Sequence, residues 1–216
     1  MTLTQLFPAG VQFEAAQESD FTAPLHPLEQ ALIERAVEKR RREFSAGRTC
    51  ARRALQKLGK SIDYLLVGEQ RQPLWPTDVV GTITHCQGFC GAAVAEKTQV
   101  LSIGFDAEQN AGLSAELHRM ILRPEEFHSL KLLPPTLPWD RLTFSAKECI
   151  HKVYFPLNSY TLDFIDARIL FNPAEYSFIA EVVNPAEKER VPLRKMQGRF
   201  CYTQDHIFTA ITLLVE

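Results

Sequence analysis

The sequence predicts an α+β protein built from two similar halves, and two observations support this fold class. Residues 28–58 place apolar side chains at spacings of seven, seven, four and three, which is one face of a helix. Residues 139–155 form a second helical stretch between Pro138 and Pro156, and short strand-like segments follow each stretch. The order of helix and then strands therefore occurs twice, although no clear repeat of the residues themselves is visible.

Local patterns define the individual elements. Gly59 stands where a helix-ending glycine is expected, and Gly47 marks a candidate break between two helices. Leu101, Ile103 and Phe105 alternate with small or polar residues, which is the period of a half-buried strand. We expect short helices over 114–121 and 124–132, and strands over 62–67, 81–85, 91–95, 100–106, 166–171, 177–183, 199–203 and 207–215.

Composition excludes several classes of protein. The chain has 216 residues, a formal net charge of −2 and 45% hydrophobic residues, as in a globular protein of one domain or two fused half-domains. Its start lacks the features of a signal peptide, and no apolar stretch approaches the roughly 20 residues that span a bilayer. Five scattered cysteines favour reduced thiols and a cytoplasmic location. A zinc site at His85, Cys86 and Cys90 is disfavoured, because no second pair of ligands accompanies them.

Two carboxylates stand at the end of a predicted strand. Asp106 and Glu108 are two residues apart, so in extended chain they point to the same side. Oxygen ligands that converge in this way suit Mg²⁺, which keeps positions open for substrate phosphates. The alternative, a solvated strand end, is more common for such a short pattern.

A second polar cluster is FSAKECIHK, residues 144–152. On a helix, Glu148 and Lys152 are i, i+4 neighbours, and so are Lys147 and His151. The plain interpretation is an exposed helix face with a salt bridge. The functional interpretation gives a third carboxylate to a metal ion and a lysine to a phosphate.

Two further clusters could bind phosphate: a strongly basic helical segment, and a predicted strand that carries polar side chains. Within KRRREFSAGRTCARR, residues 39–53, Arg40 and Arg48 are eight apart and lie near one helix face. Arginine suits phosphate because it donates two parallel hydrogen bonds. A solvated helix or a nucleic-acid contact is the alternative. In GTITHC, Thr84 and His85 offer a hydroxyl and an imidazole to the same kind of ligand.

Together these segments resemble the Sfp-type phosphopantetheinyl transferases, in the branch of enterobactin-synthase component D and the mycobacterial enzyme. The matching segments, between about residue 39 and residue 169, are RRREFSAGRTCARRALQKLG, PLWPTDVVGTITHC, SIGFDAE, WDRLTFSAKECIHKVYFPL and LDFIDARI. The resemblance implies a pseudo-symmetric fold of two lobes, each a small, mainly antiparallel sheet with helices. The lobes would comprise residues 1–110 and 111–216, with the active site at their interface.

The resemblance also implies an activity. Such an enzyme transfers the 4′-phosphopantetheine group of coenzyme A to a serine of an apo acyl or peptidyl carrier protein and releases adenosine 3′,5′-bisphosphate. Carriers of fatty-acid, polyketide or non-ribosomal peptide synthases, including those for siderophores, are the implied partners. Mg²⁺, or Mn²⁺ in its place, is the implied metal. The implied protein is a monomer that binds neither nucleic acid nor membranes.

The resemblance carries over to individual residues. It implies metal ligands at Asp106, Glu108 and Glu148. It implies coenzyme A contacts at Arg40, Arg48, Arg71, Thr84, His85, Lys147 and Lys152. Of these, the two first arginines would bind the 3′-phosphate and adenosine end, and the two lysines the pyrophosphate. Glu148 is the candidate general base, and Lys152 and His85 would stabilise the leaving group. Residues 110–137 are expected to provide part of the carrier surface.

Two other classes of protein explain parts of this sequence. Another magnesium-dependent phosphate-ester enzyme, such as a nuclease, also uses clustered carboxylates. The common nuclease arrangement has a lysine two residues after the second carboxylate, where this chain has Asn110. A nucleic-acid binding module would explain the basic helix. It would not explain the carboxylates, which repel a phosphate backbone in the absence of metal.

Overall fold

The computed structural model describes residues 1–215, which form two compact units. The N-terminal unit comprises residues 9–101 together with Val215, and the C-terminal unit comprises residues 1–8 and 102–214. The sequence analysis divides the chain after residue 110, whereas the units separate between Leu101 and Ser102. The first residues belong to the C-terminal unit because Leu6 is buried and Phe7 packs against Phe105.

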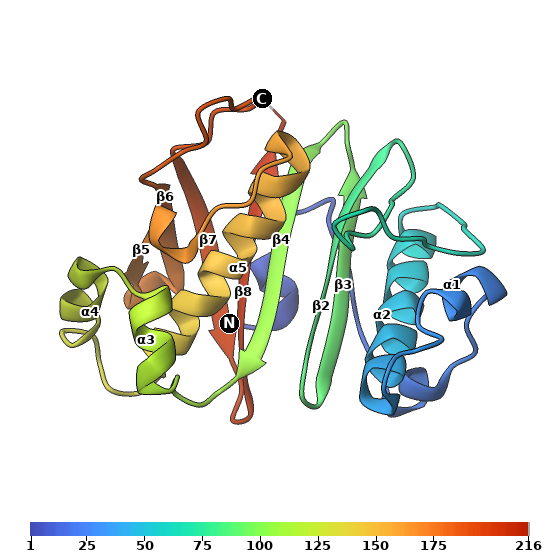
Figure 1. The fold of residues 1–216 in the computed structure, drawn as a ribbon, viewed down its shortest axis with the longest axis horizontal. Helices are drawn as coiled ribbons and strands as arrows, with labels where there is room; N and C mark the ends of the chain where they lie inside the picture. Colours follow the sequence, from blue (N-terminus) through green and yellow to red (C-terminus); the bar gives the residue numbers. More distant parts are fainter. Residues whose placement is uncertain (216) are drawn as a thin grey trace. The chain divides into compact units, whose positions relative to one another are not determined.

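The N-terminal unit is a three-stranded antiparallel sheet with one long helix. Its strands are β1 (Gln12–Ala15), β2 (Val79–Cys86) and β3 (Phe89–Glu96), in the order β1-β3-β2. The helix α2 (Glu38–Lys57) packs against this sheet (Figure 1). The 3-10 helix η2 (Glu18–Thr22) and the short helix α1 (Pro27–Ala31) precede it. Buried side chains of α2, among them Cys50, Ala51, Ala54 and Leu55, form its part of the core.

Three expectations for this unit are wrong. The helical stretch 28–58 is divided at residues 32–37, not at Gly47. Gly47 lies inside α2, where an added Cβ would be 3.0 Å from Cγ2 of Ile83, so glycine allows close packing on β2. Residues 62–67 are not a strand; only Val67 forms a bridge, with Pro73. Strand β1 was missed because its four residues, QFEA, are too short to show a period.

The C-terminal unit is a five-stranded sheet with a second long helix. Its strands, in the order β4-β8-β7-β6-β5, are β4 (Val100–Gln109), β5 (Ala167–Asn172), β6 (Ser177–Val182), β7 (Lys195–Tyr202) and β8 (His206–Leu214). The helix α5 (Trp139–Asn158) packs against β8 and β5, with α3 (Ala115–Ile121) and α4 (Pro124–Leu130) near one end (Figure 1). Three 3-10 helices complete the unit: η1 (Leu3–Leu6), η3 (Phe164–Asp166) and η4 (Pro173–Glu175).

The core of the C-terminal unit lies between α5 and the sheet. Trp139, Leu142, Ile150 and Tyr154 of the helix pack with buried side chains of β5 to β8. The expectation that Pro156 ends this helix is wrong. Pro156 lies in the last turn, and the helix ends where Ser159 adopts a left-handed conformation, with φ of 53°.

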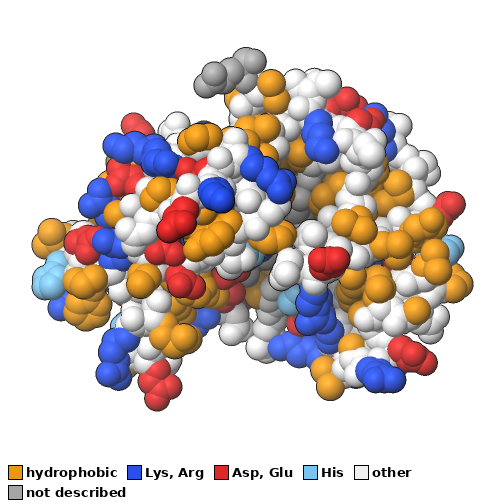
Figure 2. Space-filling view, turned by 45° about the horizontal axis from the view of Figure 1, so that its top comes forward, with side chains coloured by type: hydrophobic (Ala, Val, Ile, Leu, Met, Phe, Trp, Pro, Cys, Tyr) orange, Lys and Arg blue, Asp and Glu red, His pale blue; other side chains and the backbone are white. Residues whose placement is uncertain are grey.

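The predicted α+β class, with antiparallel sheets in both halves, is confirmed. None of the described helices is both long and apolar enough to cross a membrane. Figure 2 shows charged side chains of both signs among hydrophobic ones on one face of the molecule, consistent with the small net charge. All five cysteines are free thiols.

Candidate functional site

Strand β4 turns a polar face toward helix α5. Ser102 donates a hydrogen bond of 3.2 Å from its hydroxyl to the carbonyl of Val153. Because side chains alternate along a strand, Asp106 and Glu108 lie on the same face as Ser102, while Phe105 points to the other face and stacks on Phe208. The strand is therefore buried on both faces, and its carboxylates meet the helix instead of solvent.

Gly104 sets the distance between strand and helix. A Cβ added at this position would be 2.2 Å from the backbone oxygen of Cys149, closer than any side-chain atom can approach. The absence of a side chain therefore lets α5 lie directly on β4. This close approach brings Lys152 to Asp106.

We expect Gly104→Ala to destabilise the protein by about 3 kcal/mol, because the backbone of α5 must move to admit a methyl group. Transfer activity should fall with the displacement of α5. Gly112→Ala is the matched control, since its Cβ would meet only Asp140 at an ordinary 3.6 Å. Thermal unfolding of both variants checks this expectation, and equal melting temperatures would contradict it.

Ion pairs hold two of the carboxylates. Nζ of Lys152 lies 2.8 Å from Oδ1 of Asp106 and donates to the carbonyl of Phe105 at 2.9 Å. Nη1 of Arg141 donates to Oε2 of Glu108 at 3.0 Å. Asp106 is only 5% exposed, so this charge is largely removed from water. A buried carboxylate requires such compensation.

The three predicted metal ligands share one electrostatic environment. Burial raises the pKa of Glu108, with a further upward contribution from Asp106, against the opposing effect of Arg141. Burial also raises the pKa of Glu148, where Lys152 lowers it and Asp106 raises it. Although burial lowers the pKa of Lys152, Asp106 and other neighbours shift it upward overall, which keeps the lysine charged. Three carboxyl groups therefore share this environment with two cations, Lys152 and Arg141.

The donor set fits a hard divalent cation. In the part of the chain that the structure describes, no three His, Cys, Asp or Glu side chains are close enough to hold a metal ion in their present conformations. Asp106 and Glu108 are instead held by Lys152 and Arg141. The oxygen donors of these three carboxylates, contributed by β4 and α5, are of the type that suits Mg²⁺.

Arg141 and Asp140 were missed by the sequence analysis. Arg141 donates to the carbonyls of Ala111 and Gly112 at 3.1 and 3.2 Å, in addition to its contact with Glu108. Asp140 accepts a hydrogen bond of 2.9 Å from the backbone of Leu113. The first turn of α5 thus holds the segment that follows the carboxylate strand. No local pattern indicated this role, because the contacts join positions about thirty apart in the chain.

Glu148 also lines a separate pocket of about 280 Å³ within the C-terminal unit. Leu162, Phe164 and Ile150 supply apolar walls, and His151 lies at its edge. Burial lowers the pKa of His151, which favours the neutral imidazole. The carboxylate therefore stands beside a pocket that Lys147 and Asp163 also line.

In the N-terminal unit, four of the predicted coenzyme-binding residues line one pocket of about 180 Å³. They are Arg40, Arg48, Arg71 and His85, contributed by α2, by the loop that precedes β2 and by β2 itself. Residues separated by up to 45 positions are thus brought together around a single cavity. The positive charge of this cavity suits an anion.

Arg48 is held rigidly at the wall of this pocket. Its Nε donates to the carbonyl of Leu65 at 2.8 Å, and its guanidinium stacks on Phe44 at 4.0 Å from the ring centre. The residue is 4% exposed, and burial lowers its pKa to about 10 despite the opposing charge of Glu29. Its Nη2 is buried and makes no hydrogen bond with any of the described residues. A buried cationic donor of this kind fits an anionic ligand.

His85 contacts Arg40 through one ring nitrogen. Nη1 of Arg40 lies 2.7 Å from Nε2 of His85, and Nδ1 lies 3.4 Å from a carboxylate oxygen of Glu43. Since a guanidinium can only donate, Nε2 must accept and the proton must be on Nδ1. In this arrangement the imidazole is neutral. Both His85 and Arg40 line the pocket, and Arg40 also lies over the ring of Phe44.

Arg71 adopts a left-handed backbone conformation, with φ of 64°. This conformation costs a residue other than glycine about 1 kcal/mol. We expect Arg71→Gly and Arg71→Asn to preserve the melting temperature, because both residues accept positive φ readily. Both should weaken coenzyme A binding about tenfold through the lost guanidinium. Calorimetric titration checks this expectation, and an unchanged dissociation constant would contradict it.

The structure buries the side chains of two of the predicted coenzyme A contacts, Thr84 and Lys147. Thr84 precedes His85 in β2, so its side chain lies on the opposite face of the sheet, where it is buried. Lys147 is inside the C-terminal unit, where Nζ bonds Oε2 of Glu126 at 2.6 Å and the carbonyl of Ile121 at 2.8 Å. In this structure its ammonium is buried in an ion pair and is not available to a pyrophosphate.

Comparison with known proteins identifies the class to which these features belong. Residues 28–95 match the 4′-phosphopantetheinyl transferase N-terminal domain, and residues 102–203 match the 4′-phosphopantetheinyl transferase superfamily. The chain belongs to this superfamily, and its predicted identification as a 4′-phosphopantetheinyl transferase is confirmed.

Curated relatives cover nearly the whole chain. The chain is 38% identical to 4′-phosphopantetheinyl transferase Npt of Nocardia iowensis, over 95% of this chain and 97% of that protein. It is 35% identical to 4′-phosphopantetheinyl transferase PptT of Mycobacterium tuberculosis, over 98% and 97%. It is 36% identical to enterobactin synthase component D of Escherichia coli O157:H7, over 56% and 58%. The predicted branch of the family is therefore confirmed.

Proposed function

We propose that the protein transfers the 4′-phosphopantetheine group of coenzyme A to a serine of an apo carrier protein with the help of Mg²⁺. One observation supports coenzyme A as the donor of the transferred group. The buried Nη2 of Arg48 makes no hydrogen bond with any of the described residues, and Arg48 lines a pocket together with Arg40 and Arg71. This arrangement supports binding of a phosphate, and the 3′-phosphate of coenzyme A would supply one.

The carboxylate cluster has a different role in this proposal. Asp106, Glu108 and Glu148 would hold Mg²⁺, which when bound would neutralise the charge that develops on the pyrophosphate. Lys152 would exchange its contact with Asp106 for the pyrophosphate oxygens. Arg141 would release Glu108 for the metal while keeping its contacts with Ala111 and Gly112.

The transfer step is a single displacement at phosphorus. The serine oxygen of the carrier forms a bond to the phosphorus that bears pantetheine. The bond between that phosphorus and the bridging oxygen breaks, and adenosine 3′,5′-bisphosphate leaves. Glu148 would accept the serine proton, directly or through water, since it is a carboxylate beside an open pocket. Lys152 would stabilise the negative charge of the leaving group, and His85 would do so once Arg40 leaves Nε2 and that nitrogen carries a proton.

The described contacts weaken the nucleic-acid alternative. Most of the basic helix is already neutralised by acidic side chains of the same unit. Arg52 pairs with Glu29, Arg53 with Asp20 and Glu14, Lys57 with Glu14, and Arg42 with Glu18. The remaining arginines, Arg40, Arg48 and Arg71, line a small cavity. Binding of a duplex instead requires a row of exposed cations along its phosphates.

We propose that α3, α4 and the segment after them form part of the carrier surface. Met120 and Leu132 are 65% and 86% exposed there, beside the cations Arg119 and Lys131. Apolar side chains next to positive charge suit an acidic amphipathic helix. Arg119→Glu should lower kcat/KM for the carrier several-fold without changing the affinity for coenzyme A. Arg123 is a poor test, because it is tied to Glu125 and to the carbonyl of Ile165.

The decisive experiment mixes purified protein, Mg²⁺, coenzyme A and an apo carrier domain, and then weighs the carrier by intact-protein mass spectrometry. The carrier should gain the mass of one phosphopantetheine group. The gain should vanish with chelator and in a carrier whose serine is replaced by alanine. A panel of fatty-acid, polyketide and peptide carriers that all stay unmodified, with folded enzyme that binds no coenzyme A, would overturn the proposal. The monomeric state and cytoplasmic location remain predictions.

A further inference from the structure

A completely buried glutamate lies behind Arg48. Glu29 of α1 is 0% exposed. Its Oε1 accepts a hydrogen bond of 2.9 Å from the backbone of Leu65, and both of its oxygens lie 2.9 Å from Nη1 of Arg52. Oε2 also accepts from the backbone of His26 at 3.2 Å. This carboxylate therefore joins α1, α2 and the 60–66 loop.

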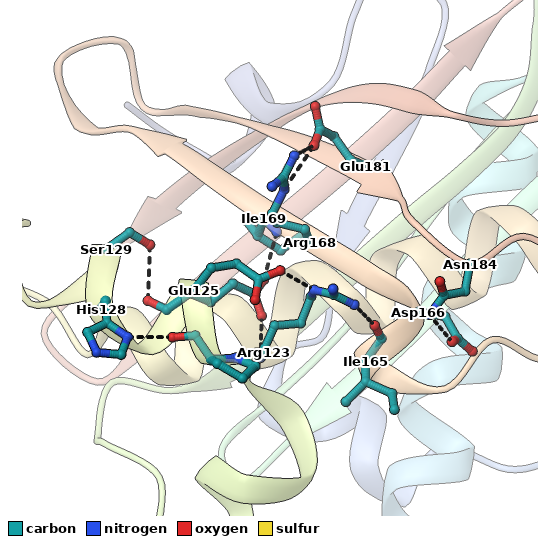
Figure 3. A network of polar contacts seen from close by, with 12 residues as sticks. Arg123, Glu125, His128, Ser129, Ile165, Asp166, Arg168, Ile169, Glu181 and Asn184 are labelled. Atoms are coloured by element: carbon teal, nitrogen blue, oxygen red, sulfur yellow. Dashed lines mark hydrogen bonds and ion pairs between the residues drawn. The ribbon is translucent and has the colours of Figure 1, made fainter.

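The C-terminal unit contains a matching glutamate. Glu126 of α4 is 1% exposed, and it accepts hydrogen bonds from the backbones of Arg123 and Ile169 at 2.9 and 2.7 Å. It pairs with Lys147 of α5. Figure 3 shows the surroundings of this anchor, in which Arg123 extends to the carbonyl of Ile165 and Ile169 lies on the neighbouring strand.

The two anchors follow one sequence pattern. Glu29 and Glu126 each stand at the third position of a short helix that begins with proline, and each caps its own helix. The long helices that they bind both contain Phe-Ser-Ala, at residues 44–46 and 144–146. Counted from these tripeptides, Arg48 corresponds to Glu148. This short repeat is the signal that could have indicated both anchors from the sequence.

Glu29 and Arg48 bind the two backbone polar groups of the same residue, Leu65. Glu29 binds the N–H of Leu65, while Arg48 binds its carbonyl oxygen at 2.8 Å. The carboxylate lies 3.8 Å from Nε of Arg48. The guanidinium is thereby fixed on three sides, by Leu65, by Glu29 and by the ring of Phe44. Its Nη2 is buried and has no hydrogen-bond partner among residues 1–215.

We propose that Glu29 is a positioning residue that orients Arg48 for a phosphate of the nucleotide substrate. It does not touch the ligand. It holds the Leu65 peptide and supplies the negative charge that keeps a buried guanidinium in place. This inference rests on the proposed binding of coenzyme A at the arginine pocket. It gives α1 a function in substrate affinity.

The test measures binding of adenosine 3′,5′-bisphosphate by isothermal titration calorimetry, without metal or carrier. In folded Glu29→Gln the dissociation constant should rise about tenfold while the stoichiometry stays that of wild type. Glu126→Gln is the matched control, with equal burial, the same helix position and an ion pair to the other long helix. Its dissociation constant should remain that of wild type. A merely structural role for Glu29 would lower the stoichiometry and leave the dissociation constant unchanged.

A double-mutant cycle tests whether Glu29 influences nucleotide affinity through Arg48. If Glu29 acts through Arg48, Glu29→Gln adds no further loss to Arg48→Met. Should Glu29→Gln fail to fold, Glu29→Asp keeps the charge at a shorter reach and should raise the dissociation constant several-fold. Wild-type binding together with unchanged affinity in the folded Glu29 variant would overturn this inference alone. A wild-type protein that binds neither this nucleotide nor coenzyme A would overturn the proposed function as well.

Discussion

Asp106→Asn is expected to lower the rate of carrier modification about 10²–10³-fold. The substitution removes the carboxylate that influences both Glu108 and Glu148, and with it the centre of the proposed metal site. It also removes the anionic partner of Lys152. Glu148→Gln should have a loss of similar size, because it removes both a metal ligand and the candidate base.

Two further measurements separate loss of metal from loss of fold. Mn²⁺ binding, followed by electron paramagnetic resonance, should weaken in Asp106→Asn, and circular dichroism should remain that of wild type. Glu181→Gln is the matched control, since Glu181 is also a strand carboxylate of this unit paired with basic residues, Arg168 and Lys195. Its activity should be unchanged. A folded Asp106→Asn protein with near-normal turnover would remove this residue from the mechanism.

Arg48→Met is expected to weaken coenzyme A binding about 100-fold, which is about 2.7 kcal/mol. The affected interaction is the charge-assisted hydrogen bond from the buried guanidinium to a phosphate. Without ligand, the stability should change by less than about 1 kcal/mol, because two effects oppose each other. The bond to the Leu65 carbonyl is lost, but so is a buried charge whose desolvation lowers its pKa to about 10.

Calorimetric titration and thermal unfolding together check this expectation. A methionine side chain can retain the apolar contact with Phe44 while removing all of the guanidinium donors. Arg48→Lys should not restore binding, because an ammonium cannot bond the Leu65 carbonyl and a phosphate in the same geometry. If Arg48→Met binds coenzyme A as tightly as wild type, the pocket is not the nucleotide site.

The predictability of the fold followed the length and regularity of each pattern. The 139–155 helix was predicted from its flanking prolines, and the strands around residues 81–85 and 91–95 from the turns that separate them; the structure contains all of them. The 62–67 segment has the composition of a strand but forms a loop, whose Leu65 is bound by Glu29 and Arg48. Local propensity could not reveal this, because both partners come from helices earlier in the chain.

In the candidate site, too, local patterns predicted some features, and contacts between distant residues determined others. Strand and helix periods place Asp106 with Glu108 on one face, and Glu148 with Lys152 on another. The structure pairs Lys152 with Asp106, while the shared role of the four residues stays a prediction. The period could not distinguish Lys147 from Lys152, because each belongs to an i, i+4 pair of the same helix. In the structure, Glu126 of another helix forms a buried ion pair with Lys147, whereas Lys152 pairs with Asp106.

By itself, the sequence determined the α+β class, the two long helices, the carboxylates on one strand face and the family. These properties depend on neighbours within a few residues or on motif order. Only the tertiary structure decided that Gly104 seats α5 on β4, that Thr84 and Lys147 turn away from the predicted contacts, and that Glu29 and Arg141 support the charged residues. Those outcomes depend on which side chains, distant in sequence, are buried together. A buried charge needs a partner, and no local sequence pattern shows which residue that partner is.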